Sequence, residues 1–148
     1  MALACAGISL VSPTLTSKGS LDINSFKKVT EINVYGSVYV AKYASIVMSK
    51  NKPVNDKGEK GVIIFVSSIT AEEGLRGQVG YASTKGAINA LVLPMARDLG
   101  KYGIRVAAVA PGIFNTPMTQ IHSMPEAVKK RLISENAINR EGAVEDFG

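Results

Sequence analysis

The pair of residues in this sequence that most suggests chemistry is a tyrosine and a lysine four positions apart, Tyr81 and Lys85. At the start of a helix, that spacing places both side chains on one face. Tyrosine ordinarily ionises near pH 10, and an ammonium about 5 Å away contributes roughly 3 kcal/mol at an effective dielectric of about 20. We therefore expect Lys85 to lower the pKa of Tyr81 by about two units, which suits a general acid/base acting on a carbonyl/alcohol couple. Taken alone, the spacing is common and more often only structural.

A serine that ends an apolar run is the second candidate. Ser67 and Ser68 follow the run 61–66, and twelve residues separate Ser68 from Tyr81. Ligands bind at the carboxyl ends of strands in open parallel sheets, so a serine there could hydrogen-bond the substrate oxygen that Tyr81 protonates. The spacing favours Ser68 over Ser67. A serine in this position more often serves as a cap or a turn residue.

Asn33 is the third candidate, because it lies in the middle of a predicted helix. An asparagine amide competes with the helix for backbone hydrogen bonds. We expect Asn33 to disturb the helical hydrogen bonds and free a carbonyl for a water molecule. The alternative is an exposed or locally bonded asparagine.

Strands and helices in alternation must position these residues. Continuous apolar runs predict strands that are buried on both faces, at residues 2–8, 61–66 and 104–110. A loop is expected at 9–21, and the predicted helices run from Asp22 or Asn24 to about residue 49, over 81–99 with a kink near Ala90 caused by Pro94, and over 125–135. This order predicts an α/β fold with a parallel sheet and right-handed crossovers.

Composition excludes several other classes of protein. The 148 residues are 46% hydrophobic and 20% charged, which is typical of one globular domain. One cysteine excludes an internal disulfide, and one histidine, His122, excludes a zinc site of clustered His and Cys ligands. We expect His122 to lie in a surface loop.

Charge and hydropathy bear on partners and compartment. The net charge is +5, but the lysines are scattered without interleaved aromatic residues, which argues against nucleic acid. No apolar run is long enough for a transmembrane helix, so no membrane partner is expected. The apolar N-terminus is more typical of a strand than of a signal peptide, which favours a reduced intracellular compartment.

Together, Asn33, Ser68, Tyr81 and Lys85 match the order and spacing of the Asn-Ser-Tyr-Lys tetrad of the short-chain dehydrogenase/reductase family. The segment 110–117 resembles that family's Pro-Gly loop over the nicotinamide. The resemblance spans the chain and implies a partial Rossmann-like, doubly wound parallel sheet of about three strands.

Three further segments resemble one subfamily, the dehydrogenases of 3-hydroxyacyl-CoA and hydroxysteroids. They are Cys5-Ala6-Gly7, in which Cys5 replaces the family's Asn, the polar insertion before residues 61–64, and residues 93–99. This resemblance implies NAD as cofactor, with NADP not excluded, and an acyl-CoA or a steroid as substrate. It also implies a mitochondrial location, with the cytoplasm as the alternative, and a homo-oligomer formed through the helices that carry Asn33 and Tyr81.

The resemblance also implies a role for each matching residue. Tyr81 is the catalytic acid/base, Lys85 lowers its pKa and binds the nicotinamide ribose, and Ser68 orients the substrate oxygen. Asn33 holds a water molecule in a proton relay through Lys85. The residues implied to contact the cofactor also include Cys5, through its backbone, Phe114 and Thr116. The alternative for Cys5 is a small buried strand residue.

One family feature is missing from the sequence. The glycine-rich turn T-G-x-x-x-G-x-G, whose backbone N–H groups hold the cofactor's pyrophosphate, does not occur. We therefore expect residues 1–148 to be the incomplete, C-terminal catalytic portion of such a domain, with little activity alone. The alternative is an inactive copy that acts through assembly with full-length relatives, for which the small residues Ala82, Gly86 and Ala90 would favour close helix packing.

Overall fold

The computed structural model describes residues 1–119, 125–134, 136 and 138–147, and the chain forms two units. The first is Met1–Ala110 and the second is Pro111–Gly148. Each unit is described by itself. His122 and Glu135, the predicted end of the last helix, lie outside the described residues.

A parallel sheet of three strands forms the centre of the first unit. The strands are β1 (Ala2–Ala4), β4 (Gly61–Val66) and β5 (Ile104–Val109), in the order β1-β4-β5. Both pairs are parallel. The predicted α/β class, with a parallel Rossmann-like sheet, is confirmed.

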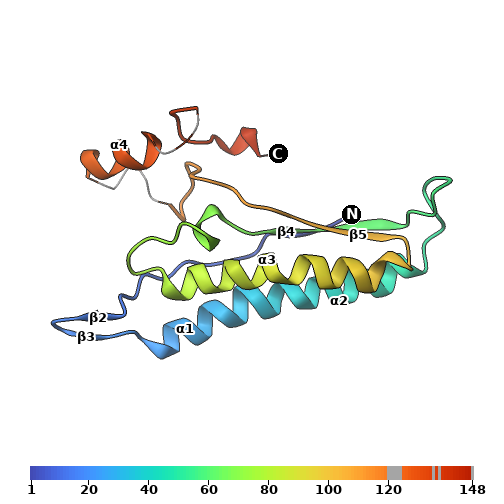
Figure 1. Cartoon of the computed structure of the whole chain (residues 1–148), viewed down its shortest axis with the longest axis horizontal. Coiled ribbons are helices and arrows are strands. Elements are labelled where there is room, and N and C mark those ends of the chain that lie inside the picture. The colour runs from blue at the N-terminus through green and yellow to red at the C-terminus, as the bar shows by residue number, and fades with distance from the viewer. Residues whose placement is uncertain (120–124, 135, 137, 148) are drawn as a thin grey trace. The chain divides into compact units, whose positions relative to one another are not determined.

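Helices connect these strands and lie along the sheet (Figure 1). They are α1 (Ile23–Thr30), a π-helical turn η1 (Glu31–Tyr35), α2 (Gly36–Ser49), a short η2 (Ile69–Ala71) and α3 (Val79–Gly100). Asp22 caps α1 as predicted, since its side chain accepts a 2.9 Å hydrogen bond from the Asn24 N–H. Pro94 lies inside α3.

The core of this unit lies between the sheet and the two long helices. Apolar side chains from all three strands pack against α2 and α3, and the buried members of this cluster are Ala4, Ala41, Met48, Ile63, Phe65, Ile88 and Ile104. Ile63 and Phe65 in the central strand are fully buried. This packing fixes the carboxyl end of β4 against the start of α3, where the candidate residues lie.

The other face of the sheet differs from the prediction that the strands are buried on both faces. Leu3 is 45% exposed and Val109 is 40% exposed, and exposed residues alternate along β5. The reason is topological. In the order β1-β4-β5, each strand lies on the same side of the strand that precedes it in the chain. Right-handed crossovers therefore place both connections on one face of the sheet, and the other face stays uncovered.

The predicted strand at 2–8 and the predicted loop at 9–21 also need correction. Only Ala2–Ala4 form β1, and Cys5 beyond it is exposed, which contradicts a small buried strand residue. The segment 9–21 contains a hairpin of two antiparallel strands, β2 (Leu15–Thr16) and β3 (Gly19–Ser20). The chain leaves the sheet after Ala4 because Ile8 pairs with a side chain, as described below.

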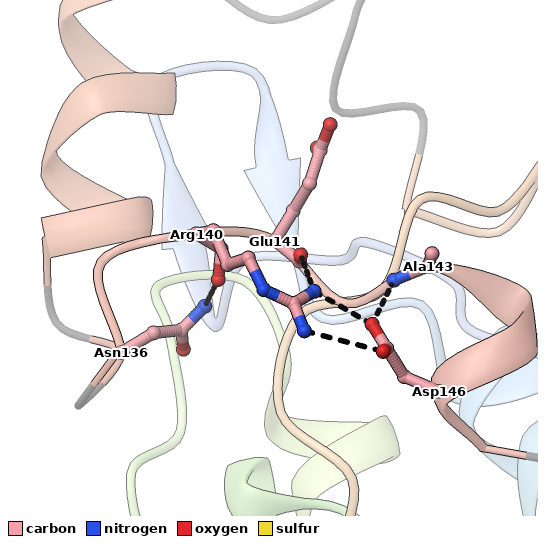
Figure 2. A network of polar contacts seen from close by, with 5 residues as sticks. All are labelled: Asn136, Arg140, Glu141, Ala143 and Asp146. Carbon is pink, nitrogen blue, oxygen red and sulfur yellow. Dashed lines mark hydrogen bonds and ion pairs between the residues drawn. The ribbon is translucent and has the colours of Figure 1, made fainter.

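The second unit contains α4 (Glu126–Ser134) and a short η4 (Val144–Asp146). Two guanidinium nitrogens of Arg140 bind the two carboxylate oxygens of Asp146 at 2.6 and 3.2 Å, and Asp146 also accepts from the Ala143 N–H (Figure 2). These hydrogen bonds lower the pKa of Asp146 to about 2. The ion pair therefore stays formed throughout the physiological pH range.

Gly103, in the turn between α3 and β5, generates the first prediction. Its φ is +70°, and an added Cβ would collide with the Gly58 carbonyl oxygen. We expect Gly103→Ala to lower the free energy of unfolding, measured by urea denaturation, by at least about 1–2 kcal/mol. Gly100→Ala is the matched control, because an added Cβ there meets nothing within 4 Å. Equal effects of the two substitutions would contradict this description of the turn.

Candidate active site

The side chain of Asn33 lies at the centre of the candidate site. It is 1% exposed and makes three hydrogen bonds. Its Oδ1 accepts from the Ile8 N–H at 2.8 Å, and its Nδ2 donates to the Ile8 carbonyl at 2.9 Å and to Thr84 Oγ1 at 3.0 Å. One amide therefore joins the chain after β1 to α3. The alternative of an exposed or locally bonded asparagine is wrong for this structure.

The helix around Asn33 is disturbed, as the sequence predicts. In η1, the Gly36 N–H donates to the Glu31 carbonyl, five residues earlier, instead of the fourth. The Asn33 carbonyl accepts a 2.7 Å hydrogen bond from Ser37 Oγ. This carbonyl therefore has a side-chain donor, and its release to a water molecule stays a prediction.

Lys85 is buried beside Tyr81. Its Nζ donates to the Val66 carbonyl at 2.8 Å and lies 5.5 Å from the centre of the Tyr81 ring. Burial lowers the pKa of Lys85, and the electrostatic influence of Cys5 opposes this. Lys85 therefore lies at the point where the end of β4, the start of α3 and the segment after β1 converge.

The pKa of Tyr81 departs from the expectation. Burial raises it above the ordinary value of 10.0, and hydrogen bonding with the Ser68 side chain opposes the rise only in part. The expected lowering by Lys85 is wrong for this structure, because burial excludes the water that would stabilise the phenolate. Tyr81 is therefore a protonated phenol at neutral pH.

The two adjacent serines have different partners. Ser67 is 3% exposed, and its hydroxyl donates to the Lys85 carbonyl at 3.1 Å. Ser68 accepts from the Thr70 N–H at 3.1 Å, and its side chain faces Tyr81. Of the two, Ser68 has its hydroxyl next to the phenol, whereas the Ser67 hydroxyl holds the helix backbone.

Gly7 brings the backbone close to this group. An added Cβ would lie 3.3 Å from Asn33 Oδ1 and 3.7 Å from Lys85 Nζ. The segment that contains Cys5 and Gly7 therefore forms one side of the site. A side chain at residue 7 would fill the space beside the Lys85 ammonium.

Phe114 and Thr116 belong to the second unit, so the structure does not place them against Tyr81. Within that unit, Phe114 forms a β-bridge with Gly142, and its carbonyl accepts from Thr119 Oγ1 at 2.6 Å. The Thr116 N–H also donates to Thr119 Oγ1, at 3.2 Å. Their contact with a cofactor remains a prediction.

Sequence reasoning missed the buried hydroxyl of Thr84. Nothing in its position signals a role, because threonine is common in helices. Ser67 is a candidate in the sequence only as the alternative to Ser68. Within the described ranges, no group of three or more His, Cys, Asp or Glu side chains could hold a metal ion. No helix among those ranges is long and apolar enough to cross a membrane.

Burial of Lys85 generates a prediction about pH and stability. Its lowered pKa means that, at pH values approaching the ordinary lysine pKa of 10.5, the unfolded chain binds more protons than the folded chain. We therefore expect the free energy of unfolding of the wild type to rise with pH in this range, relative to Lys85→Met. Urea denaturation at several pH values checks this, with Lys101→Met as an exposed-lysine control. Parallel curves for wild type and Lys85→Met would contradict the burial of this charge.

Known proteins resemble this chain in sequence. A model of the family described as enoyl-(acyl carrier protein) reductase matches residues 1–148. Human 3-hydroxyacyl-CoA dehydrogenase type-2 is 39% identical over 137 residues, which cover 91% of this chain and 51% of the human protein. Rat (3R)-3-hydroxyacyl-CoA dehydrogenase is 33% identical over 97% of this chain and 51% of its own length. The chain thus spans about half the length of the curated relatives it matches.

Solved structures show the same fold. The crystal structure of 3-hydroxyacyl-CoA dehydrogenase type-2 from Mycobacterium avium gives a TM-score of 0.85 at 29% identity, over 95% of this chain and 54% of that one. A structure of ElxO with NADP bound gives a TM-score of 0.79 at 31% identity, over 98% of this chain and 55% of that one. On the family match over its whole length and on this shared fold, the chain belongs to the short-chain dehydrogenase/reductase family.

Proposed function

We propose that this protein is an oxidoreductase that transfers a hydride between NAD and a secondary alcohol or ketone of the 3-hydroxyacyl-CoA or hydroxysteroid type. The observation that carries the proposal is the setting of Tyr81: its ring centre lies 5.5 Å from Lys85 Nζ, and Ser68, which follows the carboxyl end of β4, influences its phenol. The names of the relatives support the acyl-CoA class of substrate. In this proposal, residues 1–148 are the catalytic portion of such a domain.

Each residue of the group has a part in the proposed reaction. Tyr81, protonated at neutral pH, donates its proton to the ketone oxygen during reduction, and Ser68 holds that oxygen by a hydrogen bond. In the direction of oxidation, the Lys85 ammonium stabilises the phenolate. Asn33 joins the segment after β1 to α3 through its hydrogen bonds with Ile8 and Thr84. The resemblance gives it a further part in a proton relay.

The residues present fit a nicotinamide cofactor. Lysine has three N–H donors, and the described part of the chain gives Lys85 one hydrogen bond, to Val66, so it has the capacity to bind ribose hydroxyls. The close approach of the Gly7 backbone leaves room there that a side chain would fill. Cys5, Phe114 and Thr116 would complete the contacts. When bound, the nicotinamide supplies or accepts the hydride.

A chimera tests the proposal. Residues 1–148 replace the matching half of human 3-hydroxyacyl-CoA dehydrogenase type-2, and oxidation of NADH with acetoacetyl-CoA is followed by absorbance. We expect turnover, a preference for NADH over NADPH, and a loss of about 10²–10⁴-fold in kcat for Tyr81→Phe. Tyr102→Phe, at an exposed tyrosine, is the matched control.

A folded chimera that binds NADH without turnover would contradict the proposal, as would full activity of Tyr81→Phe. The 148-residue chain is measured in the same assay, and we expect little activity from it alone. The subfamily resemblance also favours a mitochondrial location, which fluorescence imaging of the protein in its host cell would test.

A second candidate function is assembly, and one surface favours it. Along η1 and α2, four side chains at four-residue intervals are between 55% and 64% exposed; they are Tyr35, Tyr39, Tyr43 and Val47, the tyrosine stripe. On α3, a Cβ added at Gly86 would meet nothing within 4 Å, so a neighbouring helix could approach there. Ala82, by contrast, already packs near Gly74. An exposed stripe of this kind is typical of a helix that packs on a partner.

We therefore expect the chain to form a homo-oligomer, or a mixed one with a full-length relative, through the tyrosine stripe. Size-exclusion chromatography with light scattering should show an oligomer for the wild type and a monomer for the double variant Tyr39→Asp/Tyr43→Asp. Tyr102→Asp, at an exposed tyrosine outside the stripe, should leave the oligomer intact. A monomeric wild type that does not bind the relative would exclude this candidate.

A further inference from the structure

Thr84 lies between Tyr81 and Lys85 and has no part in the function proposed above. It is 2% exposed. Its Oγ1 donates to the Tyr81 carbonyl at 2.7 Å and accepts from Asn33 Nδ2 at 3.0 Å. One hydroxyl therefore makes a bond within α3 and a bond to η1.

The capacity of the Asn33 amide makes this hydroxyl necessary. An asparagine NH₂ has two N–H donors. One donates to the Ile8 carbonyl, and the other donates to Thr84. Without the hydroxyl, a buried N–H would lose its acceptor, and such a group is costly to leave unpaired.

The bond to Tyr81 fixes the direction of the Thr84 side chain. Because the hydroxyl donates to a carbonyl one turn earlier in its own helix, its free lone pairs point away from α3. Asn33 occupies one of them. Asn33 in turn has little freedom, since Oδ1 is bound by the Ile8 N–H and a Cβ at Gly7 would lie only 3.3 Å from it.

We propose that Thr84 is a positioning residue, whose hydroxyl couples Asn33 to the turn of α3 that carries Tyr81 and Lys85 and so sets the acid/base pair against the segment after β1, at Ile8. The inference rests on the proposed function for the meaning of that pair. Displacements of about 1 Å at such a pair cost about 100-fold in rate, so a bond that fixes it is significant.

The test is the titration of Tyr81 in the full chain, followed by NMR of ¹³Cζ-labelled tyrosine and assigned with Tyr81→Phe. Thr84→Val removes the hydroxyl and keeps the shape, and Thr84→Ser keeps the hydroxyl. We expect Thr84→Val to move the pKa of Tyr81 down towards 10.0, because the loosened turn admits water, and Thr84→Ser to titrate as the wild type does.

Thr30→Val is the matched control, because the Thr30 hydroxyl donates to the Phe26 carbonyl within α1, and no other hydrogen bond of it is found in the described part of the chain. It should leave the titration of Tyr81 unchanged. A folded Thr84→Val protein with the wild-type titration would overturn the proposal.

If Thr84→Val does not fold, the test relies on the measurements made with Thr84→Ser. A changed Tyr81 titration or changed Asn33 side-chain amide signals in Thr84→Ser would overturn the role of the hydroxyl, and unchanged signals would support it. The titration needs no turnover. It can therefore fail while the chimera is active, or succeed while the chimera is inactive, which separates this inference from the proposed function.

Discussion

The amide of Asn33 is stable in the interior of this protein only while its donors and acceptor are paired. Both backbone groups of Ile8 and the hydroxyl of Thr84 pair with it. Three segments that are far apart in the sequence, the segment after β1, η1 and the start of α3, must therefore meet at one point. The end of β4 reaches the same place through the bond from Lys85 to the Val66 carbonyl, and the candidate active site lies around it.

Two buried hydroxyls, one after β4 and one on α3 itself, hold α3 in this arrangement. Ser67 binds the Lys85 carbonyl from the end of β4, and Thr84 binds the Tyr81 carbonyl while accepting from Asn33. The same burial raises the pKa of Tyr81 and lowers that of Lys85, so both groups are driven towards their neutral forms. In the proposed reaction, this environment favours a phenol that gives its proton to a ketone.

The sequence predicts most of the architecture because strands and helices leave local signals. The run 61–66 and the Asp22 cap are correct to within a residue. The short β1 could not be predicted, because Ile8 leaves the sheet for a side chain 25 residues away. The open face of the sheet depends on handedness and strand order rather than on composition. The predicted lowering of the pKa of Tyr81 is wrong because the sequence shows the spacing to Lys85 and does not show the burial of the phenol, which raises this pKa.

Amide hydrogen exchange at Ile8, followed by NMR, tests the central position of Asn33 most directly. The Ile8 N–H donates to a buried side-chain oxygen, so we predict slow exchange in the wild type. Asn33→Ala removes that oxygen, and the Ile8 amide should then exchange at least about tenfold faster, while Phe65 in the central strand stays protected. Equal exchange of the Ile8 amide in the two proteins would contradict the account.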